Sequence, residues 1–361
     1  MSTTFKYNTS GGAFQPTTYE YGRLANPVRD SLEETLASLD CGSHGFAFSS
    51  GLGAISAVFS LLSDGDHIIS MDEVYGGTFI LLRDIIKRRG VEVTFIDVTN
   101  LDKLEKAIKK NTKMLFFETP TNPSIKVADI NATVKLVKKH GDIIVVVDNT
   151  FLTSYYQRPL DFGADLVVYS ITKYMNGHSD IIMGGAITSN AGIAERLRYI
   201  QMIMGSIPSP FDCYMVSRSL KTLAIRMEQH KKNAFEMAKF LEGHPNVREV
   251  LHPGLKSHKH HEISKRQTSG HSGIFSFKHR GDVEVSKKLL TAFKVIITAV
   301  SLGGYESLAE IPDTMTHRLV PEDMRKQLGI SPDLIRLSVG IEDCNDLICD
   351  MDQALKAAFS K

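Results

Sequence analysis

The chain has 361 residues, of which 42% are hydrophobic and 23% charged, and its formal net charge is +1. This composition is typical of a globular protein long enough for one large and one smaller domain, and the near-zero charge argues against nucleic acid as a partner. No stretch approaches the ~18 apolar residues of a membrane span, and the first residues lack the apolar centre of a secretory signal. We therefore expect neither a membrane protein nor a nucleic-acid-binding protein.

The cysteines indicate a reducing compartment. They show neither the CxxC spacing of zinc sites nor a dense disulfide framework, so we expect buried free thiols and a cytoplasmic location. The cysteines are Cys41, Cys213, Cys344 and Cys349.

Short apolar runs alternate with amphipathic stretches between about residues 45 and 190. The expected strands cover 67–71, 91–96, 113–117, 143–147 and 166–169, and the expected helices cover 54–62, 101–109 and 134–140. This alternation indicates βα units of an α/β fold, with a mainly parallel central sheet and helices on both of its faces.

The pattern changes after Arg226 to long helices with isolated strands, beginning with a helix from about His230 to Glu242. We therefore expect an N-terminal segment over 1–44, a large domain over 45–226 and a smaller α+β C-terminal domain over 227–361.

Two polar residues follow two of the expected strands directly. Lys173 comes after the strand 166–169, in a loop of hydroxyls and glycine, and Asp148 follows the strand 143–147. Burial lowers the pKa of a lysine and frees its amine for a Schiff base. Proteins hold pyridoxal 5'-phosphate (PLP) with a lysine as the imine and an aspartate against the ring nitrogen. The pair predicts a PLP site with a covalent imine at Lys173.

A phosphate cradle is expected at the start of the helix 54–62. Gly51 and Gly53 allow close backbone approach, Ser50 supplies a hydroxyl, and the helix start presents unpaired N–H groups. Ser170 and Thr172 both precede Lys173 by a few residues, closely enough to donate to the same phosphate. Because no GxGxxG or P-loop motif occurs, dinucleotide and nucleoside triphosphate binding lose their main support.

Five motifs in order resemble the Cys/Met-metabolism family of PLP-dependent enzymes over essentially the whole chain. These are the segments 118–123, 147–151, 170–180, 301–304 and 335–340. Within the family, the chain most resembles the cystathionine γ-lyases. The resemblance implies fold-type I architecture, a tetramer of two dimers, and active sites at the dimer interface.

The resemblance also implies roles for single residues. Lys173, Tyr75 and Asp148 would be catalytic, with Tyr75 stacked on the pyridine ring. The cofactor would further contact Ser50, Gly51, Leu52, Asn122, Ser170 and Thr172, together with Tyr21 and Arg23 of the neighbouring subunit. The substrate would contact Arg336, which clamps its carboxylate, and Ser301, Asn122, Glu118, Ile80 and Val300.

Two positions depart from the pattern of cystathionine-cleaving members. Ile80 stands where those members have a basic residue, and Val300 stands where they have glutamate. Both changes remove groups that handle the charged distal end of cystathionine, and the pocket positions look more like methionine γ-lyase. Loss of a hydrogen bond to a charged group costs about 1.5 to 3 kcal/mol.

The expected activity is α,γ-elimination by a carbon–sulfur lyase, which gives cysteine, 2-oxobutanoate and ammonia from cystathionine. Homocysteine, methionine and cysteine are further candidate substrates. A methionine or homocysteine γ-lyase, a γ-replacement transferase of the cystathionine γ-synthase type, and a non-catalytic descendant stay open. Family members usually carry a longer arm before the segment matching Ser2–Phe5, and its absence here leaves the tetramer open. A dimer is still required, because Tyr21 and Arg23 would reach the phosphate of the neighbouring subunit.

The run His258–His261 contains three histidines in a polar loop. Adjacent histidines in such a loop are more often solvated than metal-bound, so we expect no metal site there.

Overall fold

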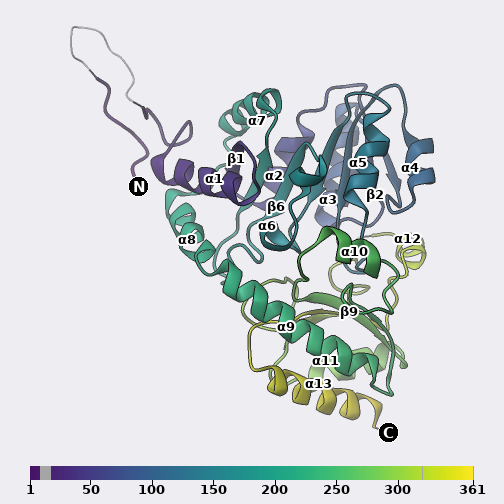
Figure 1. The fold of residues 1–361 in the computed structure, drawn as a ribbon. Helices are drawn as coiled ribbons and strands as arrows, with labels where there is room; N and C mark the ends of the chain where they lie inside the picture. The colour runs from purple at the N-terminus through teal and green to yellow at the C-terminus, as the bar shows by residue number, and fades with distance from the viewer. Residues whose placement is uncertain (9–17, 319, 361) are drawn as a thin grey trace.

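The computed structural model describes residues 1–8, 18–318 and 320–360. It contains two sheets, each covered by helices, with the larger sheet in the N-terminal half of the chain and the smaller one in the C-terminal half (Figure 1). Within the described residues, no helix combines the length and the apolarity that crossing a membrane requires.

The larger sheet has seven strands in the order β1-β7-β6-β5-β4-β2-β3. Strand β7 runs antiparallel to its neighbours β1 and β6, and the other neighbouring pairs are parallel. The strands are β1 (His44–Phe48), β2 (His67–Met71), β3 (Glu92–Ile96), β4 (Thr112–Glu118), β5 (Ile144–Asp148), β6 (Leu166–Ser170) and β7 (Gly184–Thr188). The expected mainly parallel α/β sheet is confirmed.

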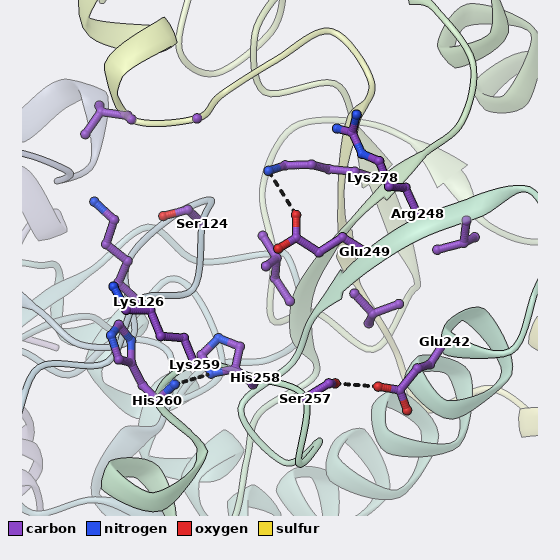
Figure 2. A pocket seen from close by; sticks show the side chains of 15 residues that line it. Ser124, Lys126, Glu242, Arg248, Glu249, Ser257, His258, Lys259, His260 and Lys278 are labelled. Carbon is purple, nitrogen blue, oxygen red and sulfur yellow. Dashed lines mark hydrogen bonds and ion pairs between the residues drawn. The ribbon is translucent and has the colours of Figure 1, made fainter.

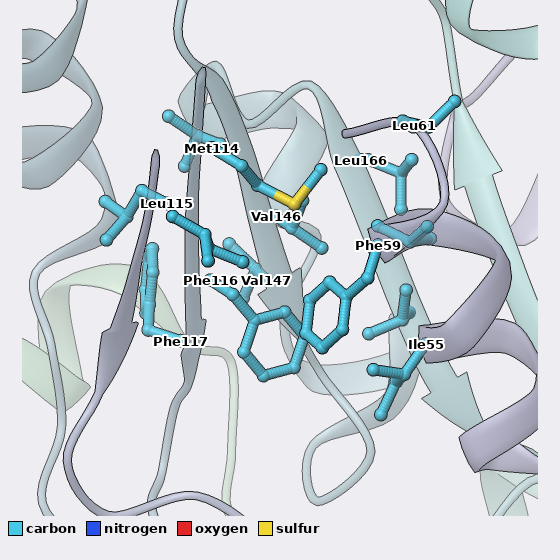
Figure 3. Packing of buried hydrophobic residues seen from close by; sticks show 14 of the residues in the cluster. Ile55, Phe59, Leu61, Met114, Leu115, Phe116, Phe117, Val146, Val147 and Leu166 are labelled. Atoms are coloured by element: carbon cyan, nitrogen blue, oxygen red, sulfur yellow. The ribbon is translucent and has the colours of Figure 1, made fainter. Parts of the chain in front are cut away.

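The central strands form because they consist almost entirely of β-branched and large apolar residues, which suit a sheet buried on both faces. Phe59 of helix α2 packs edge-on against Phe116 of β4, with ring centroids 5.2 Å apart, and Val146 and Leu166 extend the same cluster (Figure 3). This rigid core fixes the carboxyl ends of β4, β5 and β6, where the polar motifs lie.

Helices surround the larger sheet on both faces (Figure 1). They are α1 (Pro27–Leu39), α2 (Gly51–Phe59), α3 (Gly76–Ile80), α4 (Leu101–Ala107), α5 (Ile130–Lys138), α6 (Thr153–Tyr156), α7 (Ala191–Met204) and α8 (Pro210–Leu220). A π-helix over Leu81–Ile86 and 3₁₀ turns over Lys87–Arg89 and Pro159–Phe162 complete this part.

The smaller sheet has the order β10-β11-β12-β9-β8, and α9, α11 and α13 pack together beside it (Figure 1). Its strands are β8 (Val247–Leu251), β9 (Ile274–His279), β10 (Ile297–Thr298), β11 (Leu308–Glu310) and β12 (Leu334–Ser338). Its helices are α9 (Leu223–Glu242), α10 (His261–Gln267), α11 (Val283–Ala292), α12 (Glu322–Gln327) and α13 (Cys344–Phe359). The expected smaller α+β part is confirmed.

Two helix starts differ from the sequence expectation. Helix α2 begins at Gly51 because the Ser50 side chain caps it by accepting from the Gly53 N–H, so both glycines lie in its first turn. Helix α9 begins at Leu223 instead of His230 because Leu223, Arg226 and Met227 extend its buried face. The expected domain boundary at 226/227 consequently falls inside α9.

The cysteines are free, as expected, but their burial was predicted wrongly. Cys213 is buried, whereas Cys41 and Cys349 are exposed and Cys344 is intermediate. Cys41 has a positive φ of 56° in the turn after α1, and Cys349 lies on the solvent face of α13, so local position outweighs the usual preference of cysteine for the interior.

Candidate active site

The carboxyl ends of three parallel strands bring the candidate residues together. Glu118 ends β4, and Asp148 lies directly opposite it at the end of β5. Ser170 ends β6, and the loop that follows carries Lys173. Ligand sites of parallel sheets form at such strand ends. The sequence prediction that Lys173 and Asp148 belong to adjacent strand ends is confirmed.

Lys173 is partly buried, and its Nζ donates to Ser301 Oγ at 2.9 Å. Burial, and to a smaller extent the positive charge of Arg336, lowers the pKa of Lys173 to about 8, while Glu310 partly opposes both effects. A lysine in this environment has a far larger share of neutral amine near neutral pH than an ordinary lysine.

Two contacts fix the backbone around Lys173. The buried Arg226 donates to the carbonyl oxygens of Tyr174 at 2.6 Å and Met175 at 3.3 Å. Gly303, with φ of +75°, packs so closely that a Cβ there would lie 2.7 Å from Tyr174 N. Arg226 was not among the predicted site residues, and its role is to hold the loop that carries Lys173.

The two carboxyl groups at the strand ends are both strongly perturbed. Burial raises the pKa of Asp148 to about 6, although the Thr150 N–H donates to its Oδ1 at 2.9 Å. Burial and the neighbouring Asp148 raise the pKa of Glu118 well above its usual value. Two neighbouring carboxyl groups of this kind favour a bound cation, and the protonated ring nitrogen of a cofactor is such a cation.

The N-terminus of α2 faces Ser170. A Cβ at Gly51 would come within 3.1 Å of Ser170 Oγ, so glycine allows the first turn of the helix to approach that hydroxyl. The N–H groups of this turn and the helix dipole favour an anion. Thr172 Oγ1 instead donates to the Met183 carbonyl at 3.2 Å and accepts from its N–H at 3.0 Å, so a phosphate contact by Thr172 stays a prediction.

Tyr75 lies beside this cradle. Its backbone N–H donates to Glu118 Oε1 at 2.6 Å, and its side chain is 47% exposed. A Cβ at Gly77 would meet both the Tyr75 ring at 2.6 Å and Leu52 at 2.9 Å, so the ring, Leu52 and Gly77 are close neighbours. Tyr75 is therefore placed to cover a group bound near the start of α2.

Arg336 is buried in the middle of β12 at the same site. Its Nη1 donates to Asn122 Oδ1 at 3.0 Å and lies 2.8 Å from Glu310 Oε1, and its Nη2 donates to the Ser301 carbonyl at 2.7 Å. Its Nε has no hydrogen-bond partner among the described residues. Ser301 has a φ of +110°, which directs its carbonyl to Arg336 and its hydroxyl to Lys173.

Glu310, Thr316 and His317 surround Arg336 and were not predicted from the sequence. Thr316 Oγ1 donates to Glu310 Oε1 at 2.7 Å, and His317 Nε2 lies 3.2 Å from the Asn122 carbonyl oxygen. Glu310 faces Arg336 through the antiparallel pairing of β11 and β12. That pairing is a property of the fold, so no local motif could have revealed it.

The comparisons with known proteins agree with this geometry. The model of the family described as "Cys/Met metabolism PLP-dependent enzyme" matches residues 1–356. The chain belongs to this family. "Cystathionine gamma-lyase" of Mus musculus is 50% identical over 358 residues, which cover 99% of this chain and 89% of the mouse protein.

Solved structures of the family superpose closely. "Cystathionine gamma-lyase from Lactobacillus plantarum complexed with L-serine" gives a TM-score of 0.95 at 40% identity and covers 100% of this chain and 93% of that one. "Cystathionine gamma synthase from Xanthomonas oryzae pv. oryzae in complex with aminoacrylate and cysteine" also gives 0.95, at 37% identity, and covers 99% and 92%. Fold-type I architecture is confirmed. Because the lyase and the synthase share this fold, the fold does not distinguish the two activities.

The residues of this family member fit PLP. Lys173 supplies an amine with a lowered pKa, and the paired carboxyls of Asp148 and Glu118 suit a protonated ring nitrogen. Gly51 and Ser170 place helix N–H groups and a hydroxyl where a phosphate would bind. The cofactor is therefore PLP, as the sequence predicts, and the contacts of single residues with it remain predictions.

Tyr21 and Arg23 lie in the N-terminal segment, apart from the Lys173 loop in sequence. Arg23 donates to the Met202 carbonyl at 2.8 Å, and its guanidinium lies 5.7 Å from the centre of the Tyr21 ring. The buried Arg29 donates to the carbonyls of Gly22 at 3.0 Å and Leu24 at 2.8 Å and so holds the loop that presents both residues.

The two apolar substitutions lie in different surroundings. Val300 is 54% exposed and precedes Ser301, so it adjoins the site. Ile80 ends α3 and is partly buried against the large core cluster. Their shared role in a substrate pocket stays a prediction.

A pocket of about 410 Å³ lies away from Lys173, between the loop of Ser124 and Lys126 and strand β8 (Figure 2). Several of its charged side chains are already paired, for example Lys278 with Glu249 at 3.1 Å. His258 and His260 line it but are buried, contrary to the expectation that this loop is solvated. The reason is a contact between distant segments, since His260 Nδ1 accepts from the Val127 N–H at 3.0 Å. Among the described residues, no cluster of His, Cys, Asp and Glu is arranged to hold a metal.

Proposed function

We propose that this protein is a PLP-dependent carbon–sulfur lyase that acts on sulfur amino acids by α,γ-elimination. The observation that carries the proposal is the placement of Arg336 beside Lys173: Ser301 accepts from Lys173 through its hydroxyl and from Arg336 through its carbonyl. A ligand held by Arg336 would therefore present its α-carbon near the Lys173 amine. Relatives at about half identity are cystathionine γ-lyases, which supports this reaction class.

The donor count of Arg336 supports its role as a carboxylate clamp. A guanidinium has five N–H donors. In Arg336, Nη1 donates to Asn122 and also forms the ion pair with Glu310, and one Nη2 donor is directed to the Ser301 carbonyl. The two that remain, on Nε and Nη2, share one edge of the guanidinium. A substrate carboxylate bound to that edge would be held by two parallel hydrogen bonds, which fix its orientation.

The remaining residues divide the work of the reaction. PLP supplies an electron sink when it is bound, and Asp148 keeps its ring nitrogen protonated. Lys173 holds the cofactor, then removes the proton from the α-carbon and carries protons between the α- and β-carbons. Tyr75 covers the ring and is the second acid or base, while Ser50, Gly51, Leu52, Ser170 and Thr172 bind the phosphate.

The preferred substrate is one with an apolar distal end. Ile80 and Val300 supply no charge for the far amino and carboxyl groups of cystathionine, whereas a buried methyl or methylene contributes about 0.8 kcal/mol. Homocysteine and methionine should therefore compete better here than in relatives with charged residues at these positions. Cystathionine itself remains a substrate in this proposal.

The active form is a homodimer, and dimers pair into tetramers. Large apolar side chains are exposed on α7 and α8, which border the loop over 205–209, and Arg23 contacts the end of α7. These side chains are Tyr199, Ile203, Met204, Phe211 and Tyr214, each more than 50% exposed. A second copy of the chain would cover this face, and the segment 1–44 would bring Tyr21 and Arg23 to the neighbouring phosphate. The free cysteines suit a cytoplasmic location.

The alternative is a γ-replacement transferase, because the synthase structure superposes as well as the lyase structure does. Product analysis separates the two activities. Without any added acceptor, pure holoenzyme should release a keto acid and ammonia from each of the three substrates, together with a thiol from cystathionine or methionine and hydrogen sulfide from homocysteine. Turnover that requires an added thiol and gives a new thioether would instead assign the transferase, and no turnover with any of the three would contradict the proposal.

A further inference from the structure

Arg336 and four neighbouring residues form a closed ring of hydrogen bonds and one ion pair. Arg336 contacts Glu310 and Asn122, Glu310 accepts from Thr316, Thr316 contacts His317, and His317 contacts the Asn122 backbone. Glu310, His317, Arg336 and Asn122 are each at most 4% exposed. Thr316 is partly buried, so four of the five members are shielded from bulk water.

The ring has too few polar hydrogen atoms to make a hydrogen bond at every one of its close contacts. His317 Nε2 faces a carbonyl oxygen at 3.2 Å, so it must carry a hydrogen, and a neutral imidazole then has a bare Nδ1. Thr316 Oγ1 lies 2.7 Å from Glu310 Oε1 and 3.0 Å from His317 Nδ1, but its hydroxyl has one hydrogen for the two acceptors. One further proton would complete both contacts.

The position of that proton follows from burial. Burial lowers the pKa of His317 to about 4 and disfavours the imidazolium, and Arg336 acts in the same direction. Burial raises the pKa of Glu310, while Arg336 opposes the change. When the ring takes up this proton, Glu310 therefore holds it and donates its O–H to Thr316, while the Thr316 hydroxyl turns to donate to His317 Nδ1.

The charges that face Glu310 and His317 come from β12, the loop after β6 and α12. Arg336 on β12 and Lys173 after β6 act on Glu310, and Arg336 and Arg325 on α12 act on His317. Arg325 is itself paired with Asp313 at 2.7 Å. Glu310 is thus the anionic partner that Arg336 has before a substrate arrives, and a substrate carboxylate adds a second anion to the same guanidinium.

We infer that Glu310, Thr316 and His317 form a proton-accepting triad that takes up one proton when a carboxylate ligand binds Arg336. This inference rests on the proposed role of Arg336 as the carboxylate clamp. Two carboxylates on one guanidinium disfavour the ionised form of the more buried one, so the incoming ligand drives protonation of Glu310. Glu310 and His317 act here as positioning residues that match the charge of the site to its ligand.

The test measures binding of 4-methylpentanoate to the holoenzyme by calorimetry across pH. This acid has a carboxylate and an apolar chain but no amine. Binding should take up close to one proton, measured in buffers of different ionisation enthalpy. The affinity should fall about tenfold per pH unit once the pH exceeds the pKa of the triad in the ligand-free enzyme.

Glu310→Gln separates proton uptake from mere structural damage. Glutamine mimics the protonated acid, so this variant should bind 4-methylpentanoate without proton uptake, with an affinity independent of pH and higher than that of the wild type at alkaline pH. Thr316→Val is a second variant that cuts the connection to His317 and should reduce the uptake. His252→Asn removes a comparably buried histidine away from the ring and should behave like the wild type.

Binding without proton uptake in the wild type would overturn the inference and leave the carboxylate clamp intact. Uptake that persists in Glu310→Gln, or weaker binding of that variant at every pH, would also overturn it. If the wild type fails to bind 4-methylpentanoate and Arg336→Ala keeps the lyase activity of the wild type, both the inference and the proposed role of Arg336 are overturned.

Discussion

Glu118 and Asp148 lie opposite each other in the register of β4 and β5, so the site holds two buried carboxyl groups side by side. Burial raises the pKa of both, and the charge of Asp148 adds to the effect at Glu118. This arrangement destabilises the apoprotein and is relieved by a bound cation. The two carboxyl groups therefore favour cofactor binding and lower the stability of the apoprotein.

Asp148→Asn should stabilise the apoprotein while it weakens PLP retention. The folded-state pKa of Asp148 is raised to about 6 from 3.8, so the ionised group costs stability at neutral pH, by up to about 3 kcal/mol. This cost is full above pH 6 and disappears as pH falls below 4. The difference in unfolding free energy between variant and wild type should therefore shrink to zero as pH falls from 6 to 4. Urea unfolding of both apoproteins measures it. Asp142→Asn, at the exposed start of the same segment, is the control. A variant less stable than the wild type at pH 7.5 would contradict the argument.

The rate at which the apoprotein forms its covalent bond with PLP should rise as Lys173 loses its proton. With a pKa lowered to about 8, the neutral amine becomes dominant well below the pH that an ordinary lysine requires. The rate should rise about tenfold per pH unit below pH 8 and level off above it. Stopped-flow absorbance of the lysine-linked cofactor measures the profile, and a lysine peptide in solution is the reference. A rate that keeps rising to pH 10 would contradict the lowered pKa.

Sequence reasoning reached the parts of this site that lie at strand ends. Asp148 and Lys173 each follow an apolar run of strand length, and the parallel sheet then brings the runs together. The partner of Arg336 could not be found in this way, because Glu310 meets it through the register of two antiparallel strands in a different sheet. Similarly, His258 and His260 look solvated in a polar stretch, and only the packing of their loop against the segment of Val127 buries them.

Arg23→Ala and Lys173→Ala should complement each other if each site uses two chains. Either variant alone should lose most activity, but a hybrid dimer has one site with Lys173 from one subunit and Arg23 from the other. Mixing the two under conditions of subunit exchange should restore part of the activity. A mixture of Lys173→Ala and Asp148→Asn is the control, since both changes affect the same side of the site and no hybrid has an intact one. No recovery despite demonstrated exchange would mean that each site is built within one chain.

Ile80→Arg together with Val300→Glu should shift specificity toward cystathionine. The kcat/KM ratio of cystathionine to methionine should rise tenfold or more, which corresponds to about 1.4 kcal/mol in transition-state binding. Total activity should fall, because Ile80 is partly buried and a new charge there needs a partner. Ile80→Met with Val300→Gln changes size without charge and is the control. An unchanged ratio would show that these positions do not set specificity.

Peptide mapping of the reduced holoenzyme tests the central claim most directly. Borohydride fixes PLP to the amine that holds it, and mass spectrometry then locates the label. The label should lie on Lys173 alone, and Lys173→Ala prepared with excess PLP should have neither the label nor the lyase activity. A label on another lysine, or a wild-type protein that remains colourless and unlabelled with excess PLP, would contradict the account.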